Sequence, residues 1–113
     1  VQRVEEVLKA RKPVLPGARL VLSGGLSRPP MEPTEASVAL FAKARAIGEA
    51  LGLRLEPGRV GGGSDGNFTA ALGVPTLDGL GLFGGDAHQK TEYVVVPEIP
   101  RRTALLAELL AAL

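Results

Sequence analysis

Residues 61–77 read GGGSDGNFTAALGVPTL, and this stretch decides the fold class. Its three leading glycines predict a turn, residues 65–72 a short helix ended by Gly73, and residues 74–77 a strand. Asp65 stands at the expected helix start, where a carboxylate caps free N–H groups. Because glycine lets the backbone approach a ligand closely, the turn is a candidate binding loop.

Two longer helices are expected on either side of this stretch. The first covers residues 34–51, with Thr34 as its N-cap and Gly52 as its C-terminal stop. The second follows Pro100 and runs to the end of the sequence. The apolar positions expected to face the core in these helices are Leu40, Ala44, Ile47, Leu51, Leu105, Leu106, Leu109, Leu110 and Leu113.

Short apolar segments between the helices are typical of strands. We expect strands over residues 18–23, 53–56 and 74–77, a loop over 82–87 and an extended segment over 93–96. The alternation of helix and strand predicts an α/β fold with a mostly parallel sheet and flanking helices. In such sheets, ligands bind at the carboxyl ends of the strands, where the glycine-rich turns are expected.

The amino-terminal part differs in composition from the rest. Residues 1–12 have the pattern of an amphipathic helix, and residues 27–33 contain three prolines, which exclude regular structure there. This break predicts a domain boundary near Pro30. Because the sequence opens with Val1 in the middle of a helical pattern, we expect it to begin inside a longer protein.

The composition excludes several classes of partner. The 113 residues carry a net charge of +1, which gives no electrostatic reason to expect nucleic acid or an anionic membrane. There is no cysteine, so disulfides and thiolate metal sites are excluded, and we expect a cytoplasmic location. No apolar run approaches the roughly 20 residues of a membrane span.

The only histidine, His88, lies in a second glycine-rich turn, GGDAH at residues 84–88. A lone histidine is more often structural or exposed than a ligand, but such a loop has little packing reason to hold an imidazole. A catalytic zinc site needs about three protein ligands, so others must be carboxylates or lie outside this chain. The nearby carboxylates are Asp65, Asp78, Asp86 and Glu92. We expect the two turns to form two walls of one cleft.

Arg28 is a second candidate binding residue. The proline that follows it restricts its backbone, which favours a bidentate contact to a carboxylate, although by residue type a solvated arginine is more common. Gly61, Gly63 and Gly66 match a Gly-x-Gly-x-x-Gly nucleotide loop only loosely. The residues alone therefore leave open a non-catalytic α/β module that binds an anion or nucleotide, and a purely structural fragment.

Taken together, these features resemble the carboxyl-terminal part of the zinc-dependent metallopeptidase family of glutamate carboxypeptidase, acetylornithine deacetylase and succinyl-diaminopimelate desuccinylase. Residues 61–77 are similar to the family's Gly-Gly-Gly-Thr/Ser-Asp segment and the strand after it. Leu80-Gly81, residues 84–88 and Glu92-Tyr93-Val94 resemble its closing metal-histidine block. The likeness covers nearly the whole chain and is greatest to glutamate carboxypeptidases.

The resemblance assigns roles by position. It implies that His88 ligates one of two zinc ions, that Arg28 grips the substrate carboxylate, and that Gly63 and Ser64 contact the substrate. Asp65 and Glu92 do not match ligand positions. The family's other metal ligands and its general-base glutamate lie upstream and are absent here. We therefore expect these 113 residues alone to be inactive, and zinc-dependent peptidase turnover by this polypeptide would contradict that expectation.

The implied protein is a zinc-dependent amidohydrolase or metallo-carboxypeptidase that releases a glutamate-like amino acid from a small N-acyl or peptide substrate. Cobalt or manganese could replace zinc. Residues 1–30 would be the last helix and strand of an inserted lid domain through which the full-length protein forms a homodimer. Residues 31–113 would be the carboxyl-terminal part of the catalytic domain.

Overall fold

The longest helix, α2 (Glu35–Ala50), begins where the sequence predicts. In the computed structural model, which describes residues 2–113, Thr34 Oγ1 accepts a hydrogen bond from Ser37 N at 3.1 Å, and Ser37 Oγ accepts one from Thr34 N at 2.8 Å. This reciprocal capping satisfies two N–H groups that the helix leaves free. The helix gives way to Gly52, whose φ of 71° is a left-handed conformation that suits glycine.

A small core lies between α2 and the last helix, α4 (Ile99–Ala111), which follows the 3₁₀ turn η1 (Val96–Glu98). Its buried residues are Ala44, Leu53, Leu55, Leu105 and Leu109. The predicted stripe on α2 is confirmed, since Leu40, Ile47 and Leu51 pack against this core. The prediction for α4 is wrong in part, because Leu106, Leu110 and Leu113 are exposed. Leu106 and Leu110 lie off the side of α4 that meets α2, and Leu113 follows the end of the helix.

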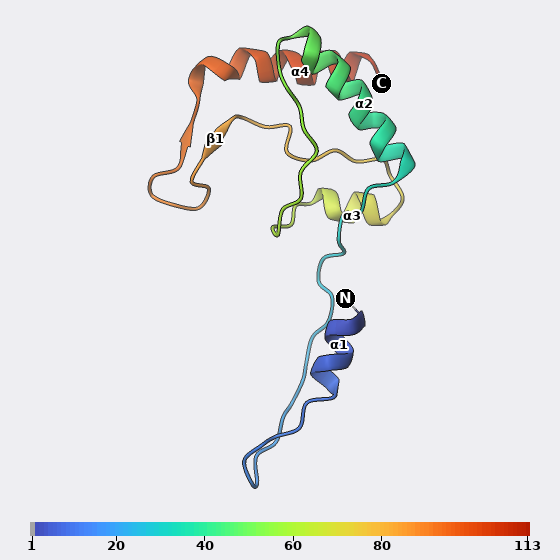
Figure 1. Ribbon diagram of the computed structural model, residues 1–113, viewed down its shortest axis with the longest axis vertical. Helices are drawn as coiled ribbons and strands as arrows, with labels where there is room; N and C mark the ends of the chain where they lie inside the picture. Colours follow the sequence, from blue (N-terminus) through green and yellow to red (C-terminus); the bar gives the residue numbers. More distant parts are fainter. Residues whose placement is uncertain (1) are drawn as a thin grey trace.

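The short helix α3 (Gly66–Ala71) lies beneath this pair, on the side from which the amino-terminal residues leave (Figure 1). Gly73 follows it with a φ of 83°, as a helix-terminating glycine does. The chain then returns to the core, where Leu77 and Leu80 pack.

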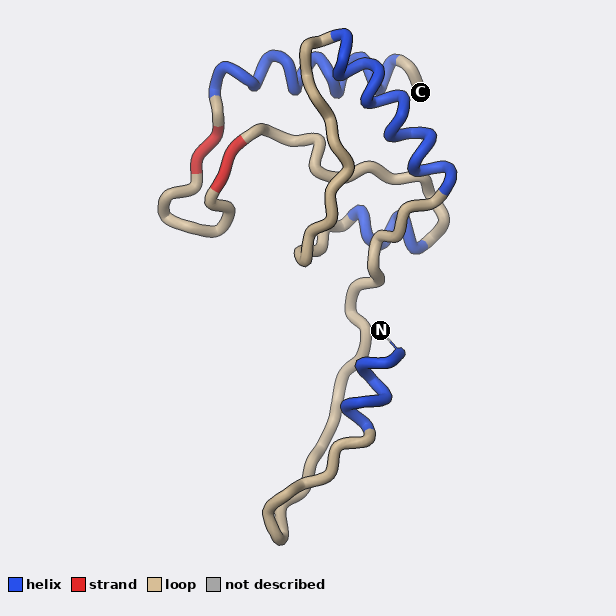
Figure 2. Tube along the Cα trace, in the orientation of Figure 1, coloured by secondary structure: helices blue, strands red, loops and turns tan. Residues whose placement is uncertain are grey.

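The only sheet among residues 2–113 is a two-stranded antiparallel ribbon (Figure 2). Strands β1 (Gly84–Gly85) and β2 (Tyr93–Val94) pair with Gly84 opposite Val94. The predicted loop over 82–87 is therefore wrong in part, because Gly84 and Gly85 belong to a strand. The extended segment predicted over residues 93–96 is confirmed at Tyr93 and Val94 and is wrong at Val96, which begins η1.

The predicted parallel sheet does not form within the described chain. Residues 18–23, 53–56 and 74–77 are not assigned to strands, because no neighbouring backbone in residues 2–113 pairs with them. A strand needs such a neighbour for its hydrogen bonds. Residues 53–56 nevertheless alternate as a strand does, with Leu53 and Leu55 buried and Arg54 and Glu56 exposed.

Residues 2–27 form an extended projection, named here the arm (Figure 1). It consists of α1 (Gln2–Lys9) and a long irregular segment, and α1 packs against no other helix or strand of the described chain. The helix ends at Lys9 rather than Lys12, and Val1, where the prediction began, lies outside the described residues. No helix in residues 2–113 is long and apolar enough to cross a lipid bilayer.

The described chain exposes far more surface than a closed domain of its size. Its accessible area is 9240 Å², whereas a folded monomer of 11.7 kDa exposes about 5,900 Å². Its radius of gyration is 19.8 Å, against about 13 Å for a compact domain of this length. Much of the excess lies on the arm, where Val14 is 95% exposed and Val21 67% exposed.

Candidate functional site

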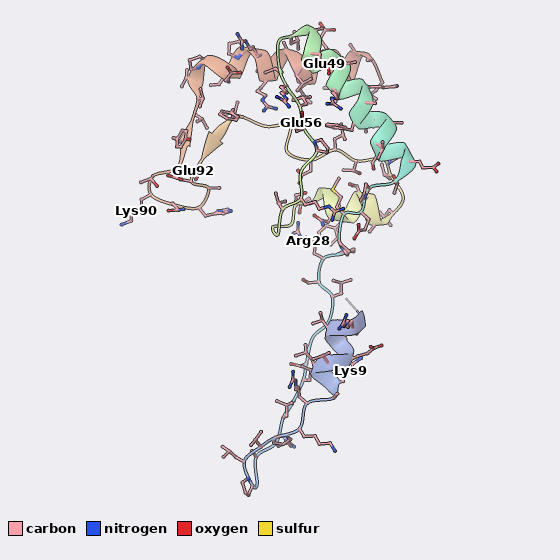
Figure 3. The ribbon with its side chains drawn as sticks, in the orientation of Figure 1. Lys9, Arg28, Glu49, Glu56, Lys90 and Glu92 are labelled. Atoms are coloured by element: carbon pink, nitrogen blue, oxygen red, sulfur yellow. The ribbon has the colours of Figure 1, made fainter. Side chains whose placement is uncertain are left out.

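Arg28 is held at the junction between the arm and α3, where Figure 3 places it. Its Nη1 lies 3.4 Å from Asp65 Oδ1, and its guanidinium carbon lies 4.8 Å from the centroid of the Phe68 ring. The aromatic face attracts the cation and supports its plane. The side chain is half-buried, and the guanidinium therefore has a defined position rather than a free, solvated one.

Gly63 lets this arginine lie directly on the turn. A Cβ on Gly63 would stand 2.6 Å from Arg28 Cδ, too close for either group to keep its place. The Gly63 N–H takes part in none of the hydrogen bonds within residues 2–113. The turn thus offers a backbone donor beside a guanidinium, and this pair of groups suits a carboxylate.

The start of α3 is capped by side chains other than the predicted one. Asp65 stands at the predicted N-cap position, but the prediction is wrong in part, because its side chain makes no cap hydrogen bond, is 97% exposed and faces Arg28 instead. Ser64 Oγ accepts from Gly66 N at 3.1 Å, and Asn67 Oδ1 accepts from Ser64 N at 2.8 Å. Because these two N–H groups are already used, the turn has fewer free donors for a phosphate than its glycines suggested, and Ser64 offers its hydroxyl.

Asn67 and Phe68 are contacts of this site that the sequence did not single out. Asn67 Nδ2 donates to Pro29 O at 2.7 Å, a bond between groups 38 residues apart. The available signal was a short polar side chain in the first turn of a helix, which often bonds to nearby backbone. Nothing local in the sequence pointed to Pro29 as its partner.

His88 lies in the seven-residue loop, residues 86–92, that joins β1 to β2. Asp86 and His88 have φ values of 56° and 67°, in the left-handed region that residues other than glycine seldom adopt. Gly84 and Gly85 allow the loop to close, since a Cβ on Gly84 would collide with the Tyr93 carbonyl oxygen and one on Gly85 with the Tyr93 ring. Strained residues of this kind gather at functional sites, and the imidazole is exposed there.

The described residues do not join the two turns into one cleft. The hairpin loop and the Gly61–Gly63 turn are separated along the lower side of the body, the side that faces the arm (Figure 1). No hydrogen bond or ion pair links them within residues 2–113. In the same part of the chain, no three His, Cys, Asp or Glu side chains come together as a metal site.

Two shallow cavities lie elsewhere, around Arg54 and Arg102. They have volumes of about 260 and 310 Å³, and neither is lined by Arg28, Gly63 or His88. Arg102 Nε is buried without a hydrogen-bond partner among the described residues. The candidate site is therefore the Arg28–Gly63 pair with its supports, and the His88 loop is a separate feature on the same side of the body.

Comparison with known proteins identifies the family. The family described as peptidase family M20/M25/M40 matches residues 20–112. Carboxypeptidase G2 from Pseudomonas sp. (strain RS-16) is 36% identical over 105 residues, which are 90% of this chain and 25% of that protein. No solved structure matches significantly. The chain thus spans a quarter of the length of this curated relative, and the extent of the family match shows that it belongs to peptidase family M20/M25/M40.

Proposed function

We propose that these residues are the carboxyl-terminal part of a zinc-dependent amidohydrolase that releases a glutamate-like amino acid from an N-acyl or peptidyl substrate. The observation that carries the proposal is the Arg28 guanidinium lying on the Gly63 turn beside a backbone N–H without a partner among the described residues. Family membership and the similarity to carboxypeptidase G2 support the peptidase chemistry.

Arg28 and Gly63 bind the substrate carboxylate in this proposal. The guanidinium donates two parallel hydrogen bonds to the carboxylate, while the Gly63 N–H and the Ser64 hydroxyl line the same side. Asp65 competes weakly, because its carboxylate is 97% exposed and such ion pairs are worth little in water. The substrate is thus fixed at its carboxylate end, and this orients the amide bond that is to be cleaved.

His88 supplies one metal ligand from this chain. The imidazole fits that role because it is exposed on a loop whose backbone is held by the Gln89 N to Asp86 O bond of 3.0 Å. No three His, Cys, Asp or Glu side chains within residues 2–113 lie close enough together to hold a metal ion. In this proposal, the remaining metal ligands therefore come from outside this chain. A bound zinc ion lowers the pKa of its water to about 7 and polarises a carbonyl. Cobalt or manganese can take such sites.

The exposed apolar surface is covered by the rest of the enzyme in this proposal. Residues 53–56 and 74–77 then join the mostly parallel sheet of a catalytic domain, which satisfies their unpaired backbone groups. Residues 1–30 belong to the lid, with residues 18–23 as its last strand, and the lid mediates a homodimer. The excess of accessible area over that of a closed domain supports this arrangement.

Exchange of Arg28 for Lys in the full-length protein tests the carboxylate site. We expect kcat/KM for an N-acyl-glutamate to fall roughly 100-fold, because lysine lacks the bidentate fork, and the value for the matching α-carboxamide to change little. Arg54→Lys is the control, since Arg54 is 89% exposed and, among the described residues, pairs only with Glu56. Equal losses on both substrates would refute a carboxylate-binding role for Arg28.

A further inference from the structure

The structure assigns to Asn67 the role of a positioning residue that holds the substrate-binding groups Arg28 and Gly63 together. This inference rests on the proposed function, because it concerns the same carboxylate site. Asn67 is half-buried in the first turn of α3 and is fixed by two hydrogen bonds. Each bond ends on the residue that follows one of the two binding groups along the chain.

Within residues 2–113, these two bonds are the only hydrogen bonds that join the two segments, beside the ion pair of Arg28 with Asp65 and its contact with the Phe68 ring. Asn67 Oδ1 accepts from Ser64 N at 2.8 Å, next to Gly63, and Asn67 Nδ2 donates to Pro29 O at 2.7 Å, next to Arg28. Every other side-chain hydrogen bond in residues 2–113 links residues at most seven apart, as Thr69 and Thr76 are. One amide group therefore holds the backbone next to Arg28 against the backbone next to Gly63, while Asp65 and Phe68 contact the guanidinium itself.

The prolines explain why a side chain has to do this. Pro29 and Pro30 have no N–H group, so the backbone of these two residues can take part in hydrogen bonds only through its carbonyl oxygens. The Pro29 carbonyl can only accept, and Ser64 N–H can only donate, so the Asn67 amide has one orientation that satisfies both. Aspartate in its place would turn a carboxylate oxygen toward the Pro29 carbonyl, which repels it.

Asn67→Asp in the full-length protein is the decisive variant, because it keeps the volume of the side chain and the bond to Ser64. The readout is the ratio of kcat/KM for an N-acyl-glutamate to kcat/KM for its α-carboxamide. We expect this ratio to fall about tenfold through the KM of the acid, with the carboxamide value unchanged. In an Arg28→Lys background, Asn67→Asp should change the ratio no further, because both substitutions act through the Arg28 guanidinium.

Thr69→Val is the matched control. Thr69 lies on the same helix and bonds to Gly66 O at 3.0 Å and to Thr76 Oγ1 at 2.9 Å, but does not contact Arg28 or Gly63. Loss of the Thr69 hydroxyl should lower the melting temperature and leave the ratio of the two kcat/KM values unchanged. If Asn67→Asp gives no folded protein, Asn67→Ser, which cannot reach Pro29 and adds no charge, replaces it with the same expected fall.

The outcomes separate this inference from the function on which it rests. A ratio that falls with Arg28→Lys but not with either Asn67 variant overturns the positioning role and leaves the proposed function standing. Equal losses on both substrates with the Asn67 variants also overturn it, because they indicate general destabilisation. A ratio that does not change with Arg28→Lys overturns both.

Discussion

Replacement of His88 by Asn in the full-length protein is expected to remove one zinc equivalent and to lower kcat/KM more than 100-fold. Loss of a residue that only orients a metal ligand already costs 10- to 100-fold, so loss of a ligand itself should cost more. Asparagine is the informative choice because it tolerates the left-handed backbone that His88 adopts, with φ at 67°. The loop therefore keeps its shape while the imidazole is removed.

The control for this experiment is the neighbouring residue. Gln89 is exposed in the same loop, and its backbone bond to Asp86 O does not involve its side chain, so Gln89→Ala should retain both metal and activity. Metal content after dialysis, measured by mass spectrometry, is compared with kcat/KM for the three proteins. Full zinc content in His88→Asn would exclude His88 as a ligand and leave the strained loop without that explanation.

Leu105→Ala is expected to destabilise the folded protein by about 3 kcal/mol, within the usual range for a buried leucine. Leu105 has no exposed surface and lies where α4 meets α2 and the segment that carries Leu53 and Leu55. Its removal leaves a cavity that these helices cannot close without losing other contacts. Calorimetric unfolding of the full-length protein measures the effect.

Leu110→Ala provides the comparison on the same helix. Leu110 is 65% exposed in the described chain, so the same truncation should cost much less there. A loss at Leu110 as large as that at Leu105 would mean that the rest of the full-length enzyme covers the outer face of α4, as proposed for the exposed apolar surface, whereas a small loss at Leu105 would contradict the core described here.

The parts of the fold that the sequence predicted correctly are those with local causes. Thr34 and Ser37 cap α2 within one turn, and Gly52 and Gly73 follow helices with the positive φ that glycine permits. Strands depend on distant partners, and segments such as residues 74–77 find none within residues 2–113. The sequence could predict their extended character but not what they pair with.

The candidate site likewise has parts that the local sequence predicts and parts that depend on distant contacts. Arg28 and Gly63 were identified separately, and the structure brings them into contact. Asn67 was missed because its role lies in a bond across 38 residues, which no local pattern encodes. Asp65 occupies the predicted N-cap position without a cap bond from its side chain, whereas the side chains of Ser64 and Asn67 accept from N–H groups at this helix start.

The position of Arg28 has a mechanical consequence. The arm meets the body at residues 28–30, where Figure 3 labels Arg28. A hydrogen bond from Asn67 holds the Pro29 carbonyl at this junction. Locked φ angles in both prolines leave few soft torsions there. The restricted backbone that follows Arg28, together with the bond from Asn67 to the Pro29 carbonyl, therefore fixes the point from which the guanidinium reaches the glycine turn.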